Sequence, residues 1–172
     1  MKWHAPMHSL RYILDKVSFP ADAAAERSVL LGLVMGEALR LGHCRALPIA
    51  SLWDTWEQAA ELDQIALFFD HTGRAVGYVS WMTLSAPHIA SMLTGQNTRF
   101  SLADRCSGPH LWITELVVAH GCLTLALAHM RDTLFPTFDQ VTYFRTKGSK
   151  RIAKRISTRR GHALFTAAPA AS

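Results

Sequence analysis

The stretch Ala75-Val-Gly-Tyr-Val-Ser-Trp-Met-Thr-Leu-Ser85 predicts a long strand that ends in a polar, aromatic corner. A second stretch, Trp112-Ile-Thr-Glu-Leu-Val-Val-Ala-His-Gly121, predicts another strand, with a single carboxylate in an apolar run. His43 stands upstream of both in a short loop. A histidine that meets a carboxylate across a sheet can act as a general base, so His43 and Glu115 are candidate catalytic residues.

Helices and strands alternate on either side of these stretches. Apolar periodicity predicts helices over residues 21–41, 49–62, 86–93 and 123–134, and strands over residues 64–70, 74–84, 111–118 and 139–146. A turn at His71-Thr-Gly73 joins the first two strands, and residues 94–108 are expected to be irregular. This order predicts one α/β domain, with its core at about residues 21–160 and a mixed central sheet flanked by helices. GCN5-related N-acetyltransferases use the same order, and ferredoxin-like layouts fit it nearly as well.

Composition excludes several classes of protein. The 172 residues are 49% apolar and 18% charged, as in a globular chain with a substantial core. No apolar run approaches the ~18 residues of a membrane span, and the N-terminus has no apolar signal core, so we expect a cytoplasmic protein without an integral membrane segment. Cys44, Cys106 and Cys122 are far apart and form no CxxC pair, which supports neither a disulfide framework nor a metal site.

Positive charge gathers near the C-terminus. Eight of the 18 Lys and Arg residues lie within residues 145–160, the basic stripe, which contains no Asp or Glu. Such a stripe attracts an acidic protein, a phosphorylated cofactor, nucleic acid or anionic lipid, although a solvated tail is the alternative. Nucleic acid is disfavoured because the stripe has no Trp or Tyr and no reader motif accompanies it.

Three segments resemble the toxin-activating lysine acyltransferases, which fatty-acylate RTX (repeats-in-toxin) protoxins. Residues 74–85 resemble the family's P-V-A-Y-C-S-W-A-N-L segment, and residues 106–121 are similar to S-G-D-R-x-W-I-I-D-W-I-A-P-F-G. Met130-Arg-Asp-Thr-Leu-Phe-Pro136 resembles a family helix that ends in basic residues and Phe-Pro. The order and the gaps agree over roughly residues 31–160.

The resemblance implies an N-acetyltransferase-like fold, with acyl-acyl carrier protein as the acyl donor and a protoxin lysine as the acceptor. No bound cofactor is implied. His43 matches the histidine of the family's catalytic S-P-x-H-R-x-W-P loop, and Glu115 occupies the place of its catalytic aspartate. The candidate substrate-binding residues are Ser80, Trp81, His120 and Gly121. The candidate carrier-docking residues are Lys150, Arg151, Lys154 and Arg155.

The chain also departs from the family pattern. One extra residue separates His43 from Pro48, and Arg40 stands where the family has a serine. Glu115 is one methylene longer than the family's aspartate. These departures leave open an acyltransferase of another acceptor, or one that has lost its activity.

The chemistry of the residues allows three functions, of which the first is acyl transfer to lysine. Lysine is protonated at neutral pH, so acyl transfer needs a base. Histidine can accept the proton, and a carboxylate can fix the tautomer of the histidine. Backbone N–H groups or Ser80 can stabilise the thioester oxygen. The alternatives are an N-acyltransferase that uses acyl-CoA on another amine, and a non-catalytic binding module. A homodimer is also left open. Ser80 and Trp81 can equally be core residues, and a structural Arg or Lys can pair with Glu115.

Overall fold

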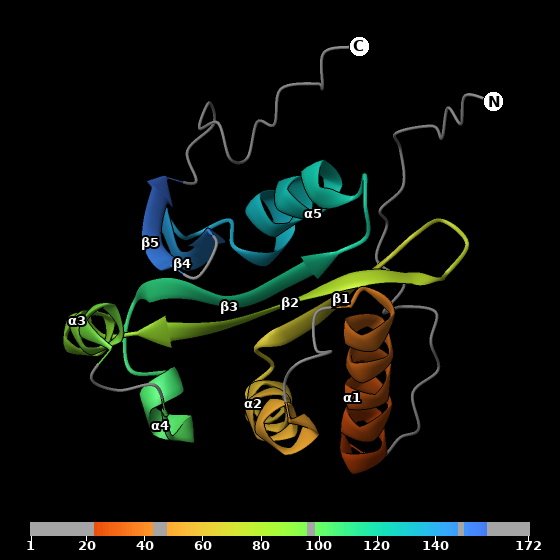
Figure 1. Ribbon diagram of the computed structural model, residues 1–172, viewed down its shortest axis with the longest axis horizontal. Helices are drawn as coiled ribbons and strands as arrows, with labels where there is room; N and C mark the ends of the chain where they lie inside the picture. The colour runs from red at the N-terminus through yellow and green to blue at the C-terminus, as the bar shows by residue number, and fades with distance from the viewer. Residues whose placement is uncertain (1–22, 43–47, 96–98, 148–149, 158–172) are drawn as a thin grey trace, which may run out of the picture.

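A five-stranded mixed sheet forms the centre of the protein (Figure 1). The computed structural model describes residues 23–42, 48–95, 99–147 and 150–157. The helices are α1 (Ala23–Arg40), α2 (Ile49–Glu61), α3 (Ala86–Thr94), α4 (Leu102–Arg105) and α5 (Leu123–His129), which continues into a π-helical turn, η1 (Met130–Leu134). The strands are β1 (Ile65–Phe69), β2 (Ala75–Leu84), β3 (His110–Val118), β4 (Gln140–Lys147) and β5 (Lys150–Ser157).

The strands lie in chain order, and all neighbours are antiparallel except the parallel pair β3 and β4. A parallel pair needs a crossover connection, which α5 and η1 supply. The predicted hairpin between β1 and β2 is confirmed. Its Gly73 takes a φ of 80°, and the Asp70 carboxylate accepts hydrogen bonds from the backbone N–H groups of Thr72 and Arg74.

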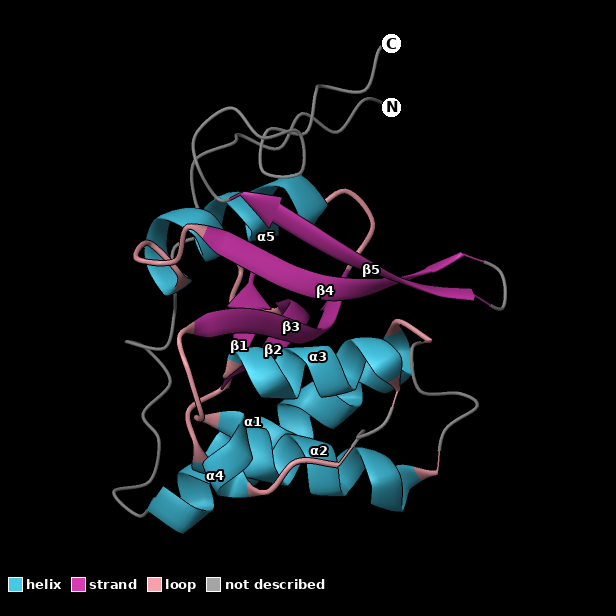
Figure 2. Cartoon of the chain, turned by 90° about the vertical axis from the view of Figure 1, so that its left-hand side faces the viewer, coloured by secondary structure: helices cyan, strands magenta, loops and turns pink. Residues whose placement is uncertain are grey.

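Helices cover both faces of the sheet. Figures 1 and 2 show α1, α2 and α4 on one face of the sheet and α5 on the other. The periodicity that predicts the helix over residues 49–62 gives it one apolar face, and Leu52, Trp56 and Ala59 of that face are buried against α1, β1 and β2. On the opposite face, Ala126 and Leu127 of α5 pack in a second core cluster with residues of the sheet. The predicted α/β fold, an N-acetyltransferase-like mixed sheet flanked by helices, is thus confirmed.

Two irregularities of β3 shape the site. The ladder between β3 and β4 comprises only three residue pairs, from Leu111↔Val141 to Ile113↔Tyr143, and the strands separate beyond them. Against β2, the register shifts at Ser80/Trp81, so Thr114 is the extra residue of a β-bulge. A bulge changes the direction of the side chains that follow it.

Two expectations were wrong in detail. Residues 94–108 are not wholly irregular: they include α4, which begins with a capping box between Ser101 and Asp104. The strand over residues 139–146 is not the last one, because much of the basic stripe forms β5 and pairs with β4 along its whole length. The predicted helix over residues 123–134 is confirmed, with its last turn widened into η1. No helix within the described residues is long and apolar enough to cross a membrane.

Candidate active site

The β-bulge places Glu115 on the α2 face of the sheet. Ile113 packs on the α5 face, so strict alternation would put Glu115 there as well. Instead, the Glu115 carboxylate accepts a hydrogen bond of 2.7 Å from Nε1 of Trp56 on α2. Trp56 is 1% exposed and packs edge-to-face against Tyr78, with ring centroids 5.9 Å apart. A buried indole N–H needs an acceptor, so this bond fixes the half-buried carboxylate.

The loop that carries His43 connects α1 to α2, and His43 and Cys44 lie outside the described residues. The predicted contact between His43 and Glu115 therefore stays a prediction. The described end of α1 is anchored: the Arg40 guanidinium pairs with the buried Glu37 carboxylate and donates to the Ala75 carbonyl at 3.4 Å. The hydrogen bond with Glu37 raises the pKa of Arg40. The arginine at the family's serine position thus ties the start of the loop to β2.

Ser80 and Trp81 lie in β2 beside Glu115. Ser80 is fully buried and stands opposite Glu115 in the register; its hydroxyl lies 2.6 Å from that of Thr114. Trp81 points to the other face and packs edge-to-face on Phe135, with ring centroids 5.1 Å apart. Their predicted role in substrate binding stays a prediction, and the structure gives both a packing role.

A cavity of about 300 Å³ opens where β3 and β4 separate, and we call it the splay cavity. Its lining on β3 comprises residues 113–116, and its lining on β4 comprises Val141 and residues 143–145. Leu127 of α5 and Met130 of η1 complete the wall. The ladder between the strands has ended here, so backbone groups of each strand face the cavity rather than the other strand.

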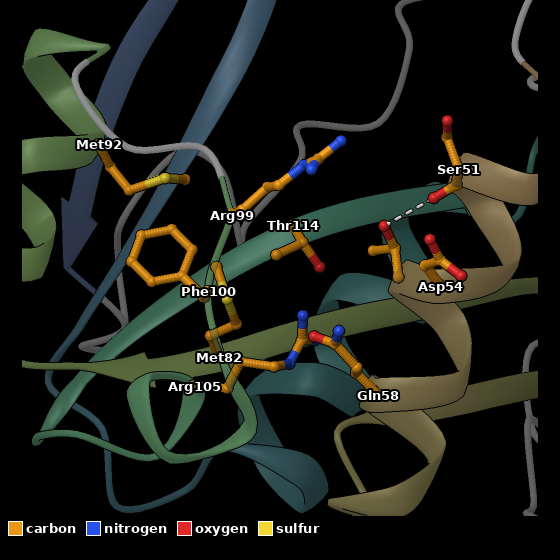
Figure 3. Close-up of a pocket in the computed structure, with 10 residues that line it drawn as sticks. Ser51, Asp54, Gln58, Met82, Met92, Arg99, Phe100, Arg105 and Thr114 are labelled. Carbon is orange, nitrogen blue, oxygen red and sulfur yellow. Dashed lines mark hydrogen bonds between the residues drawn. The ribbon is translucent and has the colours of Figure 1, made fainter.

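A second cavity, of about 470 Å³, lies on the α2 face, and we call it the α2 cavity (Figure 3). Its α2 wall presents Ser51, Asp54, Thr55 and Gln58, and its other walls comprise Met82, Met92, Arg99, Phe100, Arg105 and Thr114. Thr114 lines both cavities. Thr114, the residue of the bulge that precedes Glu115, therefore forms part of the wall of both cavities.

His120 and Gly121 form the exposed turn between β3 and α5, where Gly121 takes a φ of 84°. Neither residue lines the splay cavity or the α2 cavity. Their predicted role in substrate binding stays a prediction.

The β4–β5 hairpin carries much of the basic stripe (Figure 2), and the strand register places its described basic residues on two faces. In the register, Tyr143 pairs with Lys154 and Arg145 with Ile152, on the same face as the buried pair Val141 and Ile156. Arg151 and Arg155 project from the opposite face, where the Arg151 guanidinium lies 4.3 Å from the centre of the Phe144 ring. Lys154 thus does not share a face with Arg151 and Arg155, and the predicted docking role of these residues stays a prediction. Lys154 and Arg145 share the face of the splay cavity, and Arg145 lines it.

The sequence did not point to Trp56 or Arg105 as residues of the site. Helical periodicity accounts for Trp56 only as a residue of the apolar face of α2, although its indole N–H requires a polar partner once it is buried. Arg105 is 4% exposed, and its one sequence signal is the Ser101/Asp104 capping box that starts its short helix.

Comparison with protein families identifies the chain. The model of the HlyC family, the RTX toxin acyltransferase family, matches residues 24–159, which include both cavities and Glu115. The chain belongs to the RTX toxin acyltransferase family. It is therefore an acyltransferase of a family that acts on RTX toxins. A search of curated proteins finds no significant match.

Proposed function

We propose that this RTX toxin acyltransferase transfers a fatty acyl group from acyl-acyl carrier protein to the ε-amine of an internal lysine of an RTX protoxin and thereby activates it. The observation that carries the proposal is that two cavities share Thr114, the residue before Glu115, since transfer between two large substrates needs two approaches to one reaction centre. Membership of the family supports the reaction class.

The donor fits the splay cavity. The prosthetic arm of a carrier protein is a long, flexible chain with two amide groups and a terminal thioester. Separated strands offer such a chain unpaired backbone N–H and C=O groups, in the manner of an added β-strand. Leu116, Leu127 and Met130 give the cavity an apolar wall that suits an acyl chain.

Catalysis is assigned to His43 and Glu115. His43 removes a proton from the lysine ammonium, and Glu115 orients the imidazole and stabilises its charged form. The free amine attacks the thioester carbonyl, the new C–N bond forms as the C–S bond breaks, and the carrier thiolate leaves and takes up a proton. Trp56 in turn holds the Glu115 carboxylate through its indole N–H.

The carrier protein docks on the cationic rim of the splay cavity. Carrier proteins are acidic, and the arm begins at a phosphate. Arg145 lines the cavity and Lys154 shares its face, so both can attract that surface and guide the arm inward. Electrostatic attraction of the carrier protein to such a rim weakens strongly as the ionic strength rises.

Intact-mass analysis tests the proposal. The enzyme is incubated with an RTX protoxin fragment and either acyl-acyl carrier protein or the matching acyl-CoA. We expect one acyl increment per acceptor lysine with the carrier donor, and none when the modified lysine is changed to Arg. Transfer from acyl-CoA alone would instead identify a CoA-dependent N-acyltransferase, and absence of transfer from both donors would favour a binding module.

A further inference from the structure

Arg105 is a buried cation without an acidic partner. Its side chain is 4% exposed, and among the described residues no carboxylate lies within salt-bridge distance of it. Burial lowers the pKa of Arg105, but a guanidinium stays charged at any physiological pH. A buried charge is costly unless an opposite charge compensates it, so this position is suited to a ligand that brings an anion.

The guanidinium is held in place by neutral groups. Its Nε donates to the Gln64 side-chain oxygen at 3.2 Å, and one terminal nitrogen donates to the Trp81 carbonyl at 3.4 Å. Gln64, itself 4% exposed, donates in return to the Arg105 carbonyl at 3.1 Å. These bonds fix the orientation of the side chain without neutralising its charge, and they leave further N–H donors for a ligand.

The free part of the guanidinium belongs to the α2 cavity. Figure 3 shows Arg105 and Arg99 projecting into the cavity from different segments, with α2 forming the opposite wall. Ser51, Thr55 and Gln58 on that wall supply hydrogen-bonding groups, and Asp54 adds one negative charge. Met82, Met92 and Phe100 form an apolar end. Such a mixed wall is suited to a peptide segment with polar and apolar side chains.

The position of the cavity favours the acceptor over the donor. The donor arm fits between β3 and β4, in the cavity that α5 closes. The α2 cavity lies on the other face of the sheet and reaches the same bulge at Thr114. Two substrates that enter from opposite faces would therefore approach the same bulge, next to Glu115, without competing for space.

We propose that the α2 cavity binds the protoxin segment around the acceptor lysine and that Arg105 pairs with the carboxylate of an acidic residue in that segment. This inference rests on the proposed function for the identity of the acceptor. It adds a specificity rule: lysines with an acidic neighbour placed to reach Arg105 are preferred, because a bidentate Arg–carboxylate pair is strong and geometrically selective.

Peptide binding tests the inference without any catalysis. Fluorescently labelled peptides with one central lysine carry a single Glu at successive flanking positions, and each has a twin with Gln. Anisotropy should show that the wild-type protein binds at least one Glu peptide about tenfold more tightly than its twin, which corresponds to about 1.4 kcal/mol. Equal binding of all twins by the wild-type protein overturns the proposal, whatever the variants do.

Two variants locate the effect. Arg105→Gln should reduce the preference for Glu to less than about twofold, and Arg105→Lys should retain only part of it. Arg74→Gln removes an exposed arginine from the start of β2 and should keep the full preference. If the Arg105 variants keep it too, another group recognises the acid. Circular dichroism melting confirms that the Arg105 variants are folded.

The remaining outcomes separate the two proposals. If phosphopantetheine alone shows binding that depends on Arg105, the site belongs to the donor and the inference is wrong. If the acidic preference is found but intact mass shows no acyl transfer to the bound peptide or a protoxin, the peptide site stands and the proposed function fails. If transfer occurs without acidic preference, the function stands and the inference fails.

Discussion

The two cavities that share Thr114 have walls of different character. The splay cavity lies between separated strands, and apolar residues of α5, η1 and β3 dominate its wall. The α2 cavity presents two arginines, one aspartate and several hydroxyl and amide groups, with an apolar end. The first suits an extended arm with an acyl chain, and the second suits a peptide with charged neighbours.

This difference teaches how a bulge can organise transfer between two proteins. Without the extra residue, Glu115 would face α5 together with Ile113. The bulge places the carboxylate against Trp56 of α2, while Glu115 still lines the splay cavity. Changes at this boundary should affect the chemistry itself, whereas changes within one cavity should affect one substrate.

The largest effect is expected from His43→Ala. Loss of the general base should lower the rate of lysine acylation by about 10²-fold or more. Binding of the donor and of the acceptor peptide should both persist, because neither cavity has been altered. Initial rates from intact mass and peptide anisotropy measure the two properties on one sample.

His71→Ala is the matched control, since His71 is an exposed histidine in the β1–β2 turn, and its activity should equal that of wild type. Near-normal acylation by the His43 variant would remove His43 from the mechanism.

Glu115→Gln should lower the turnover number by about tenfold to 10²-fold with little change in either Michaelis constant. The amide is isosteric and can still accept from Trp56, so folding should be preserved. A carboxylate raises the pKa of a neighbouring imidazole, so its removal should shift the acid limb of the pH–rate profile to lower pH.

A rate loss without that shift would show that Glu115 supports the fold but does not orient the base. Glu57→Gln changes an exposed carboxylate on α2 and should leave both rate and pH profile unchanged.

Charge reversal can test whether only one face of the β4–β5 hairpin serves the donor. Arg145→Glu with Lys154→Glu should raise the Michaelis constant for the carrier donor by about tenfold, mainly at low salt. The matched pair on the other face, Arg151→Glu with Arg155→Glu, carries the same change in net charge and should have a much smaller effect.

Steady-state rates over a range of salt concentrations measure the Michaelis constant for the carrier donor in each double variant. Equal effects of the two pairs would show that net charge, and not one docking face, attracts the carrier. Unchanged donor use by the first pair would make acyl-CoA the better candidate donor.

The sequence predicted the sheet better than the site. The apolar run of β2 and the Asp70–Gly73 turn specified a hairpin locally, and the buried face of α2 followed from helical periodicity. The sequence did not predict β5 because only Ile152, Ala153 and Ile156 interrupt its Lys and Arg residues. An edge strand can be this charged because one side stays open to solvent.

The site depended on tertiary geometry that a local pattern does not encode. The register shift at Thr114 arises from pairing with β2, and it alone decides which helix Glu115 faces. Arg105 is buried by Gln64 and Trp81, which are 41 and 24 residues away along the chain. Neither the register shift nor the burial of Arg105 has a signature within its own segment. Resemblance and spacing could therefore predict His43 and Glu115 as site residues, but they could not predict Trp56 and Arg105.

Trp56→Phe tests the support of Glu115. Phenylalanine keeps an aromatic ring against Tyr78 but removes the indole N–H, so the carboxylate loses a donor. One hydrogen bond of about 1 kcal/mol predicts a loss of about fivefold in turnover. Trp53→Phe, on the exposed side of the same helix, should leave turnover unchanged. Equal turnover of the two variants would show that Trp56 acts only in packing.

The smallest effect is expected from low pH on the local stability of α5, which forms part of the wall of the splay cavity. His129 lies at the end of α5 against Phe68, and burial lowers its pKa while Asp132 opposes the shift. The unfolded chain therefore binds the proton more readily, so stability falls as the pH falls through about 6.5 towards the folded-state pKa. Amide exchange in α5 should accelerate between about pH 7 and pH 5 relative to α2 after correction for intrinsic rates, and His129→Gln should remove the difference. If α2 and α5 respond alike in the wild type and in the His129 variant, the two helices do not differ in acid sensitivity, and His129 does not stabilise the α5 wall of the splay cavity.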